Sequence, residues 1–245
     1  MHSAPSGNDG KTSSKLRQPA TPPDMESLNV GGRSPTSPED GFGQLWSKSY
    51  ALAFGDFSHS PEEVISTWKS RFDQFWPEGS RLHIDGRWRA GNVAAVKLAL
   101  GAGPHVYTGM LVAESGARSF RLATPQGHLF TGWIRFSARD VDGATNLHVE
   151  VRARATDPLY ELSLMLGGHR LEDIFWEHTL QAVAAHFGEN GTVTKKRQLL
   201  KRRRKWSHAW LIWYNAALRS LVWDLSAPLR NLWDRRPGER GQRHA

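Results

Sequence analysis

The stretch TNLHVEVRARA at residues 145–155 alternates apolar and polar side chains more regularly than any other part of the chain. One face carries Leu147, Val149, Val151, Ala153 and Ala155, and the other carries His148, Glu150, Arg152 and Arg154. A period of two with one polar face is typical of an antiparallel sheet that contacts water on one side. An Asp-Gly pair at 142–143, just before this stretch, indicates a hairpin. We therefore expect an antiparallel sheet around these residues.

Working outward, further strand-like segments occur before this one, and each is followed by turn residues. These segments are 49–57, 92–100, 105–113, 118–123 and 128–137. Ser60 and Pro61 have the pattern of a helix N-cap and first turn, and helical spacing then continues as far as Pro77. After residue 158 the period changes, and a long helix is expected from about His169 to Phe187, with Gly188 as its stop. The order of elements predicts an α+β fold.

Three segments resemble the START-like superfamily, also called SRPBCC or helix-grip. They are SHSPEEVISTW (58–68), TGWIRF (131–136) and EDIFWEHTL (172–180). DPLYE (157–161) and GGHRLEDIFW (167–176) resemble an uncharacterised bacterial branch of it. The resemblance covers about residues 48–188 and implies a curved antiparallel sheet wrapped around the long C-terminal helix, with an apolar cavity between them. A cystatin-like cone and a lipocalin barrel are the structural alternatives, although a barrel needs eight strands and only six or seven are visible.

Composition divides the chain into parts. Residues 1–44 are rich in Ser, Pro and Gly and are expected to be disordered. The START-like domain is assigned to 45–188, a polybasic linker to 189–205, a separate Trp-rich amphipathic helix to 206–233 and a disordered tail to 234–245. The chain has no cysteine, which rules out disulfides and thiolate sites. The N-terminal residues lack the apolar core of a signal peptide, and the protein is expected in the cytoplasm, peripheral at the inner face of the membrane.

Apolar side chains of the strands and of the long helix are the candidates for lining a ligand cavity. They are Val106, Met110, Val112, Phe120, Leu122, Phe130, Ile134, Phe136, Leu147, Val149, Val151, Ile174 and Phe175. The alternative is that the same residues form an ordinary filled core. The START-like resemblance favours a cavity of ligand size, usually a few hundred Å³.

Polar candidates at the same cavity are fewer: His128, Tyr160, Glu161 and His178. A His–Glu pair within hydrogen-bond reach could perform acid–base chemistry. A lone histidine is more often an ordinary surface or core residue, so no catalytic residue is assigned. No metal site is expected, because the histidines lack ligand spacing, and no cofactor is expected, because no Gly-rich phosphate loop occurs.

The C-terminal part carries the charge. Residues 195–245 hold 14 Lys or Arg against three acids, and the whole chain has a net charge of +8, so the rest is slightly acidic. A basic run at 195–205 precedes the Trp-rich segment. A wide apolar face beside basic residues is typical of a helix that lies in the headgroup layer of a membrane. The predicted membrane contacts are Lys201, Arg202, Arg203, Arg204, Lys205, Trp206, Trp210, Trp213 and Leu221.

Other interpretations of the C-terminal segment remain open. It could pack on its own domain or on a second copy, or it could span the membrane, at a cost for Asn215, Arg219 and Asp224. A specific nucleic-acid partner is not expected, because the aromatic residues form a continuous face instead of alternating with basic ones. The leading hypothesis is binding of an apolar or amphipathic small molecule, such as a lipid, combined with peripheral docking on anionic membrane. The alternatives are a cyclase- or hydrolase-type enzyme and a protein-interaction module.

Overall fold

A computed structural model describes residues 29–55, 59–84, 86–99 and 105–234, with side chains described as far as residue 226. Its centre is one antiparallel sheet of eight strands in the order β2-β3-β4-β5-β6-β7-β1-β8. The strands are β1 (Leu45–Ala53), β2 (Arg81–Ile84), β3 (Val93–Ala99), β4 (His105–Ser115), β5 (Ser119–Ala123), β6 (Phe130–Val141), β7 (Ala144–Ala155) and β8 (Thr194–Lys201).

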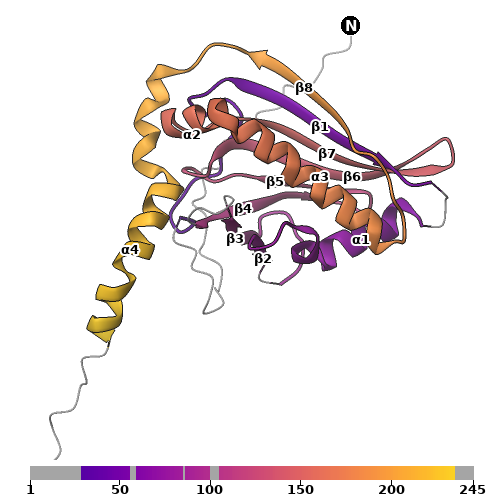
Figure 1. The fold of residues 1–245 in the computed structure, drawn as a ribbon, viewed down its shortest axis with the longest axis horizontal. Helices are drawn as coiled ribbons and strands as arrows, with labels where there is room; N and C mark the ends of the chain where they lie inside the picture. The colour runs from indigo at the N-terminus through magenta and orange to yellow at the C-terminus, as the bar shows by residue number, and fades with distance from the viewer. Residues whose placement is uncertain (1–28, 56–58, 85, 100–104, 235–245) are drawn as a thin grey trace, which may run out of the picture.

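The helices lie on one face of this sheet and at one end of it. They are α1 (Pro61–Ser70), the short η1 (Phe72–Phe75), α2 (Pro158–Ser163), the π-helical turn η2 (Leu164–Gly168), α3 (His169–His186), η3 (Trp206–Tyr214) and α4 (Ala216–Asp234). Figure 1 shows the curved sheet with α3 lying along it and α1 beside the C-terminal end of α3. The chain therefore has the helix-grip architecture: a curved antiparallel sheet that holds a long helix, with a separate C-terminal helix.

Local sequence signals account for several element boundaries. The Ser60 hydroxyl accepts a hydrogen bond from the Glu63 backbone N–H at 3.2 Å, and Pro61 occupies the first turn of α1. Asp142 and Gly143 both have positive φ, 53° and 79°, as a two-residue hairpin between β6 and β7 requires. The predicted long helix is confirmed, because α3 runs from His169 to His186.

Residues 29–44, predicted to be disordered, are ordered against the body. Val30 and Phe42 are fully buried, and the Phe42 and Gly43 backbone N–H groups donate to the Thr156 and Ala155 carbonyls. Val30 lies over Gly109, where a Cβ would overlap it. A composition average could not detect this, because two apolar side chains and a few backbone hydrogen bonds anchor an otherwise polar segment. The remainder of the predicted disorder, 1–28 and 235–245, lies outside the described residues.

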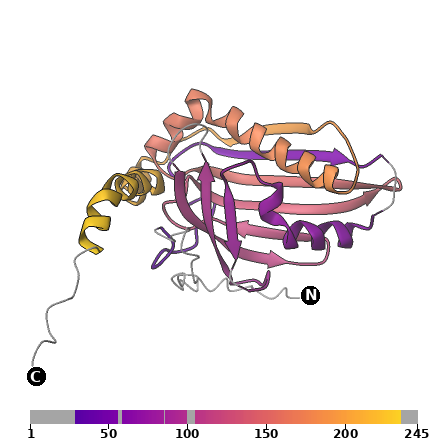
Figure 2. The same cartoon turned by 60° about the horizontal axis from the view of Figure 1, so that its bottom comes forward.

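The basic segment also differs from the prediction. Instead of a linker, residues 194–201 form strand β8, which pairs with β1 at the edge of the sheet. Basic side chains on an edge strand discourage pairing with other chains, so the Lys and Arg residues are compatible with a strand. The Trp-rich segment is not one helix: η3 ends at Tyr214 and α4 starts at Ala216, with Asn215 between them. Figures 1 and 2 show α4 leaving the body at one end of the sheet.

Candidate functional site

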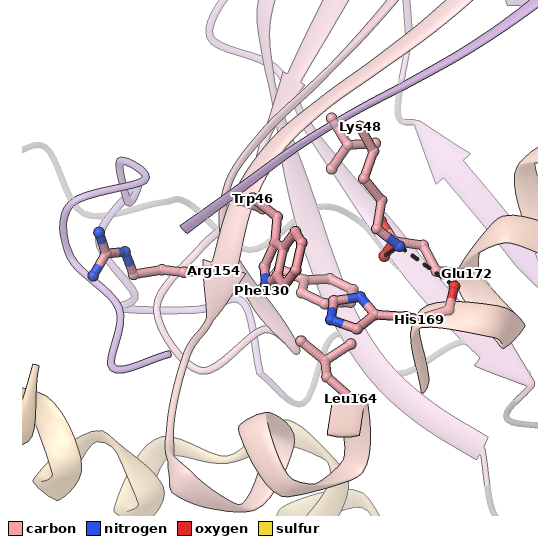
Figure 3. Close-up of a pocket in the computed structure, with 9 residues that line it drawn as sticks. Trp46, Lys48, Phe130, Arg154, Leu164, His169 and Glu172 are labelled. Carbon is pink, nitrogen blue, oxygen red and sulfur yellow. Dashed lines mark hydrogen bonds and ion pairs between the residues drawn. The ribbon is translucent and has the colours of Figure 1, made fainter. Parts of the chain in front are cut away.

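A small cavity lies between β1, the β6–β7 pair and the start of α3. It has a volume of about 10 Å³, which is room for about one water molecule. Figure 3 shows the His169 ring next to the side chains of Trp46, Phe130 and Leu164. The Arg154 side chain points away from this group. The lining residues are Trp46, Lys48, Phe130, Val151, Ala153, Arg154, Leu164, His169 and Glu172. We call this space the β1–α3 cavity.

A buried charge cluster forms one wall of the β1–α3 cavity. Lys48 Nζ lies 2.7 Å from Glu172 Oε2 and 3.2 Å from Asp173 Oδ1. The Tyr50 hydroxyl donates to Asp173 Oδ1 at 2.6 Å. Because two carboxylates hold the Lys48 ammonium, it is suited to fastening α3 onto β1 and not to nucleophilic attack.

The cluster sets the protonation of its members. Burial raises the pKa of Glu172, and the nearby Lys48 charge opposes this. Burial also acts to raise the pKa of Asp173, but hydrogen bonds from Tyr50 and the charge of Lys48 outweigh it, so the pKa of Asp173 is lowered. The pKa of Tyr50 is raised by burial and by the two carboxylates, so its hydroxyl remains a donor.

His169 is the other polar group of the cavity. Its ring packs edge-on against Trp46 with centroids 4.9 Å apart. Burial, with the charges of Lys48 and Arg197, lowers the pKa of His169 to about 4, so the imidazole is neutral at pH 7. Its Nδ1 is buried without a hydrogen-bond partner among the described residues. The cavity thus offers one neutral ring nitrogen between an apolar wall and the Lys48–Glu172 ion pair.

These cavity residues were largely missed by sequence reasoning. Of the predicted lining residues, Phe130 and Val151 line the β1–α3 cavity. The sequence patterns do not indicate Trp46, Lys48 or Leu164, which also line it. A signal for Lys48 exists in β1, because it occupies the buried face of an alternating strand between Trp46 and Tyr50. A lysine in that position requires a buried partner.

Most of the other predicted lining residues lie in a filled core. Aromatic side chains of α1 and η1 occupy the space between the sheet and α3: Trp68 packs edge-on against Phe136 at 5.3 Å, and Phe72 against Phe120 at 5.9 Å. Val106 is also buried. The predicted residues that belong to this aromatic core are Met110, Val112, Phe120, Leu122, Ile134, Phe136, Leu147 and Val149. The alternative of an ordinary core therefore describes these positions.

The two residues predicted on α3 have different surroundings. Phe175 is partly buried and packs edge-on against Trp76 with centroids 5.2 Å apart. Ile174 is 51 % exposed, so its assignment to the cavity is wrong. The buried stripe of α3 is formed by Trp176, Leu180, Val183 and Ala184, and the helix phase turns Ile174 toward solvent.

The predicted polar residues do not converge on one site. His128 is buried, and its Nδ1 accepts a hydrogen bond from the Phe130 backbone N–H at 3.2 Å. Burial lowers the pKa of His128 to about 4. Glu161 Oε1 forms an ion pair with Arg204 at 2.7 Å, and His178 is exposed on the outer side of α3. No hydrogen bond joins either histidine to Glu161 among the described residues, so no acid–base pair results.

Tyr160 belongs to the contact that holds the C-terminal segment, not to a cavity. Its hydroxyl accepts a hydrogen bond from the Ala217 backbone N–H at 2.9 Å. Asn215, at the break between η3 and α4, donates to Asp157 Oδ2 at 2.8 Å. On the other side, the Tyr107 backbone N–H donates to the Ser220 hydroxyl at 2.9 Å. Polar groups therefore attach the segment to its own domain.

The β5–β6 turn completes this attachment. Gly127 has φ +90°, and a Cβ at that position would overlap the Tyr214 carbonyl. The Gly127 carbonyl also accepts a hydrogen bond from the Ala216 backbone N–H at 2.9 Å. Only glycine permits both this backbone conformation and such a close approach.

The opposite face of the same segment is uncovered. Its exposed apolar residues are Trp206, Trp210, Trp213, Leu218, Leu221, Val222 and Leu225. They include all four apolar residues predicted to contact a membrane. We call them the apolar face of the C-terminal segment.

The predicted basic contacts divide into two groups. Lys201 and Lys205 form ion pairs with Glu39 at 2.7 and 2.9 Å, and Arg204 pairs with Glu161. Arg202 and Arg203 are exposed, and no carboxylate of the described residues pairs with them. Two cations therefore remain available directly before Trp206.

The described residues contain neither a metal site nor a helix that could span a membrane. Within the described ranges, no group of three His, Asp or Glu side chains could hold a metal ion. In the same part of the chain, no helix combines the length and apolar character needed to cross a membrane.

Comparisons with known proteins give similarities of structure. No protein-family model matches the chain, and no curated protein sequence matches it. The di-domain ARO/CYC StfQ from the steffimycin biosynthetic pathway is similar with a TM-score of 0.45 and 12 % identity, over 58 % of this chain and 50 % of that one. The chain thus spans about half the length of that structure. Protein Ms6760 from Mycobacterium smegmatis has a TM-score of 0.41 and 13 % identity, over 57 % and 89 % of the two chains. Ara h 8.0201 has a TM-score of 0.40 and 11 % identity, over 58 % and 97 %.

Proposed function

We propose that this protein docks peripherally on anionic membrane surfaces through the apolar face of its C-terminal segment. The observation that carries the proposal is how much apolar surface that segment leaves exposed. Leu211 is buried against the body together with the polar Asn215 and Ser220, whereas Trp213 and Leu225 are 81 % and 72 % exposed. A helix that packs on its own domain for stability normally buries most of its large apolar side chains.

The chemistry of the exposed face fits a membrane interface. Tryptophan is enriched at the boundary between headgroups and hydrocarbon, because the indole has an apolar body and one N–H donor. Trp206, Trp210 and Trp213 place three such rings on η3. An exposed apolar surface of this kind marks an interaction site in an otherwise water-soluble domain.

The charge next to this face selects for an anionic surface. Arg202 and Arg203 are exposed immediately before η3, and each basic residue near an anionic leaflet contributes about 1 kcal/mol. Glu39 and Glu161, the nearby acids, are neutralised by Lys201, Lys205 and Arg204. The electrostatic contribution therefore favours phosphatidylglycerol or phosphatidylserine over phosphatidylcholine.

Flotation of the full chain with vesicles tests the proposal. Vesicles of phosphatidylcholine alone are compared with vesicles that also contain phosphatidylglycerol. The double variant Trp213→Ser/Leu225→Ser should bind the anionic vesicles about tenfold more weakly, since two exposed apolar side chains no longer enter the interface. Arg202→Glu/Arg203→Glu should also weaken vesicle binding. The loss should be larger at low salt than at high salt, because salt screens the attraction between charges.

Point variants are preferable to a truncation, because deletion from residue 190 would also remove β8 from the edge of the sheet. Val141→Ser is the matched control, since Val141 is an exposed apolar residue on the β6–β7 hairpin, at the other end of the sheet. Equal flotation of wild type and Trp213→Ser/Leu225→Ser would contradict the proposal. The proposal would also be contradicted if the protein did not bind vesicles and this face were instead covered in a stable dimer or in a complex with another protein.

We propose as a second function the binding of a small apolar or amphipathic molecule in the β1–α3 cavity. Its support is the mostly apolar lining next to an irregular turn: Leu164 closes the cavity, and Gly167, three residues later, has φ 118°. At about 10 Å³ the cavity is smaller than such a molecule, so this second function requires that Leu164 be displaced when the ligand binds. Native mass spectrometry of purified protein should then detect a bound apolar molecule that is lost in Leu164→Trp. Protein without any ligand, and without gain on incubation with fatty acids, would contradict this function.

A further inference from the structure

The turn between α2 and α3 exposes apolar side chains that the proposed function does not use. Met165 and Leu166 are 65 % and 79 % exposed, while the preceding Leu164 is buried. The chain leaves helical geometry at Leu166 and at Gly167, which has φ 118°. Buried Leu164 therefore holds the turn in place, and the two following side chains project into solvent.

This turn is next to the C-terminal segment. Arg204 Nη2 lies 3.4 Å from Met165 Sδ, and Arg204 Nε lies 2.7 Å from Glu161 Oε1 on α2. Trp206, the first residue of the apolar face, follows two residues later. Figure 1 shows α2 and the start of the C-terminal helices side by side, in agreement with these contacts.

Exposed basic residues lie close to the turn along the chain. Arg170 is exposed four residues after Leu166, and Arg203 is exposed next to Arg204. Arg204 itself contacts Met165, and Glu161 balances its charge. Two exposed arginines therefore accompany the apolar tip.

We propose that the Met165–Leu166 turn is a second membrane-contact point, which enters the headgroup layer of an anionic bilayer together with the apolar face of the C-terminal segment. The inference rests on the proposed membrane docking and adds the orientation of the domain, because two separate contacts hold a rigid body more firmly than one. A lipid surface fits the turn, since side chains projecting from a turn need no complementary groove in order to enter a headgroup layer. The exposed Arg170 and Arg203 match an anionic leaflet.

The test uses the full chain and two kinds of variant. Met165→Ser/Leu166→Ser should bind phosphatidylglycerol-containing vesicles about tenfold more weakly than wild type, as two apolar side chains are lost from the interface. Val141→Ser is the control, and circular dichroism with thermal unfolding verifies that each variant folds. Since the chain has no cysteine, Leu166→Cys and Val141→Cys can each carry a single environment-sensitive fluorophore. The label at position 166 should shift to the blue on addition of anionic vesicles, and the label at 141 should not.

The outcomes separate this inference from the proposal beneath it. The second contact is refuted if Met165→Ser/Leu166→Ser floats as well as wild type, or if the emission of the label at position 166 does not shift. Docking through the apolar face of the C-terminal segment is not affected by either result. If wild type itself does not float, both fail. A blue shift that depends on protein concentration without vesicles would show that the turn contacts a second copy of the chain, and it would also refute the inference.

Discussion

Asn215 donates a hydrogen bond to Asp157 Oδ2 at 2.8 Å, and both side chains are fully buried. The same pair caps two helices. Asp157 Oδ1 accepts from the Leu159 and Tyr160 backbone N–H groups at the start of α2, and Asn215 Oδ1 accepts from the Leu218 N–H at the start of α4. One buried contact therefore fixes the direction in which the C-terminal segment leaves the domain.

Replacing Asn215 should loosen this segment. Asn215→Leu removes the cap of α4 and leaves the Asp157 carboxylate without that donor, at a cost of about 1–3 kcal/mol. Trypsin should then cleave the exposed basic run near Arg202 faster than in wild type. Ser207→Ala, at an exposed position of η3, is the control. Unchanged cleavage in Asn215→Leu would show that the segment is held by other contacts.

Removing Lys48 should destabilise the fold. Lys48→Met leaves both Glu172 and Asp173 without their partner, and breaking a buried ion pair in this way costs about 3–5 kcal/mol. The double variant Lys48→Met/Glu172→Gln should regain part of that loss, because Glu172, the less exposed of the two carboxylates, then carries no charge. Urea unfolding measures both. If the double variant is no more stable than Lys48→Met, the pair does not act as a unit.

The buried histidine His128 predicts a dependence of stability on pH. Its pKa is about 4 in the folded protein, lowered by burial from 6.5. A lowered pKa means that the unfolded chain binds the proton more tightly, so this contribution to stability is complete above pH 6.5 and is lost as the pH falls toward 4. The shift corresponds to roughly 3 kcal/mol.

The variant His128→Asn tests the contribution of His128 to the pH dependence of stability. The Asn side-chain oxygen can accept the hydrogen bond that Nδ1 receives from the Phe130 N–H, but it does not titrate. Thermal unfolding between pH 7 and pH 4 should show a shallower loss of stability in the variant than in wild type. Parallel curves would mean that His128 is not buried in its neutral form.

The filled core around Phe72 predicts that removal of this side chain destabilises the fold, whereas a residue that lines an open cavity could be shortened at little cost. Phe72 is buried and contacts Trp76, Trp88 and Phe120 at centroid distances of 5.1, 5.2 and 5.9 Å. Phe72→Ala should cost about 3–5 kcal/mol and should create a void that an apolar dye can enter. Urea unfolding and dye fluorescence measure the two effects. Little loss of stability would indicate that the space around Phe72 is already loosely filled.

Local patterns predicted those parts of the fold that depend on local chemistry. The alternation at residues 145–155 is strand β7, and the Ser60 cap begins α1. The sequence does not indicate strand β8, because half of its residues, TKKRQLLK, are Lys or Arg. The alternating apolar pattern that identifies a strand is absent here, since the strand lies at a sheet edge and is ordered by hydrogen bonds to one neighbour, β1.

The candidate site was predicted less well, for a different reason. Whether Phe120 and Phe136 line a void or fill a core depends on what enters the space from α1, and sequence alone does not give the depth to which Trp68 reaches. Similarly, exposure of Trp213 depends on which side of η3 the domain holds, and distant residues such as Asp157 decide this. Both questions concern tertiary contacts between segments far apart in the chain.

Depth-dependent quenching measures the central claim most directly. Trp213→Cys in the full chain carries the only thiol, and a fluorophore attached there reports contact with spin-labelled lipids. In vesicles that contain phosphatidylglycerol, the label at position 213 should be quenched most strongly by spin labels near the headgroups, while a label at Val141→Cys should not be quenched. Bound protein whose label at position 213 is not quenched would contradict docking through the C-terminal segment.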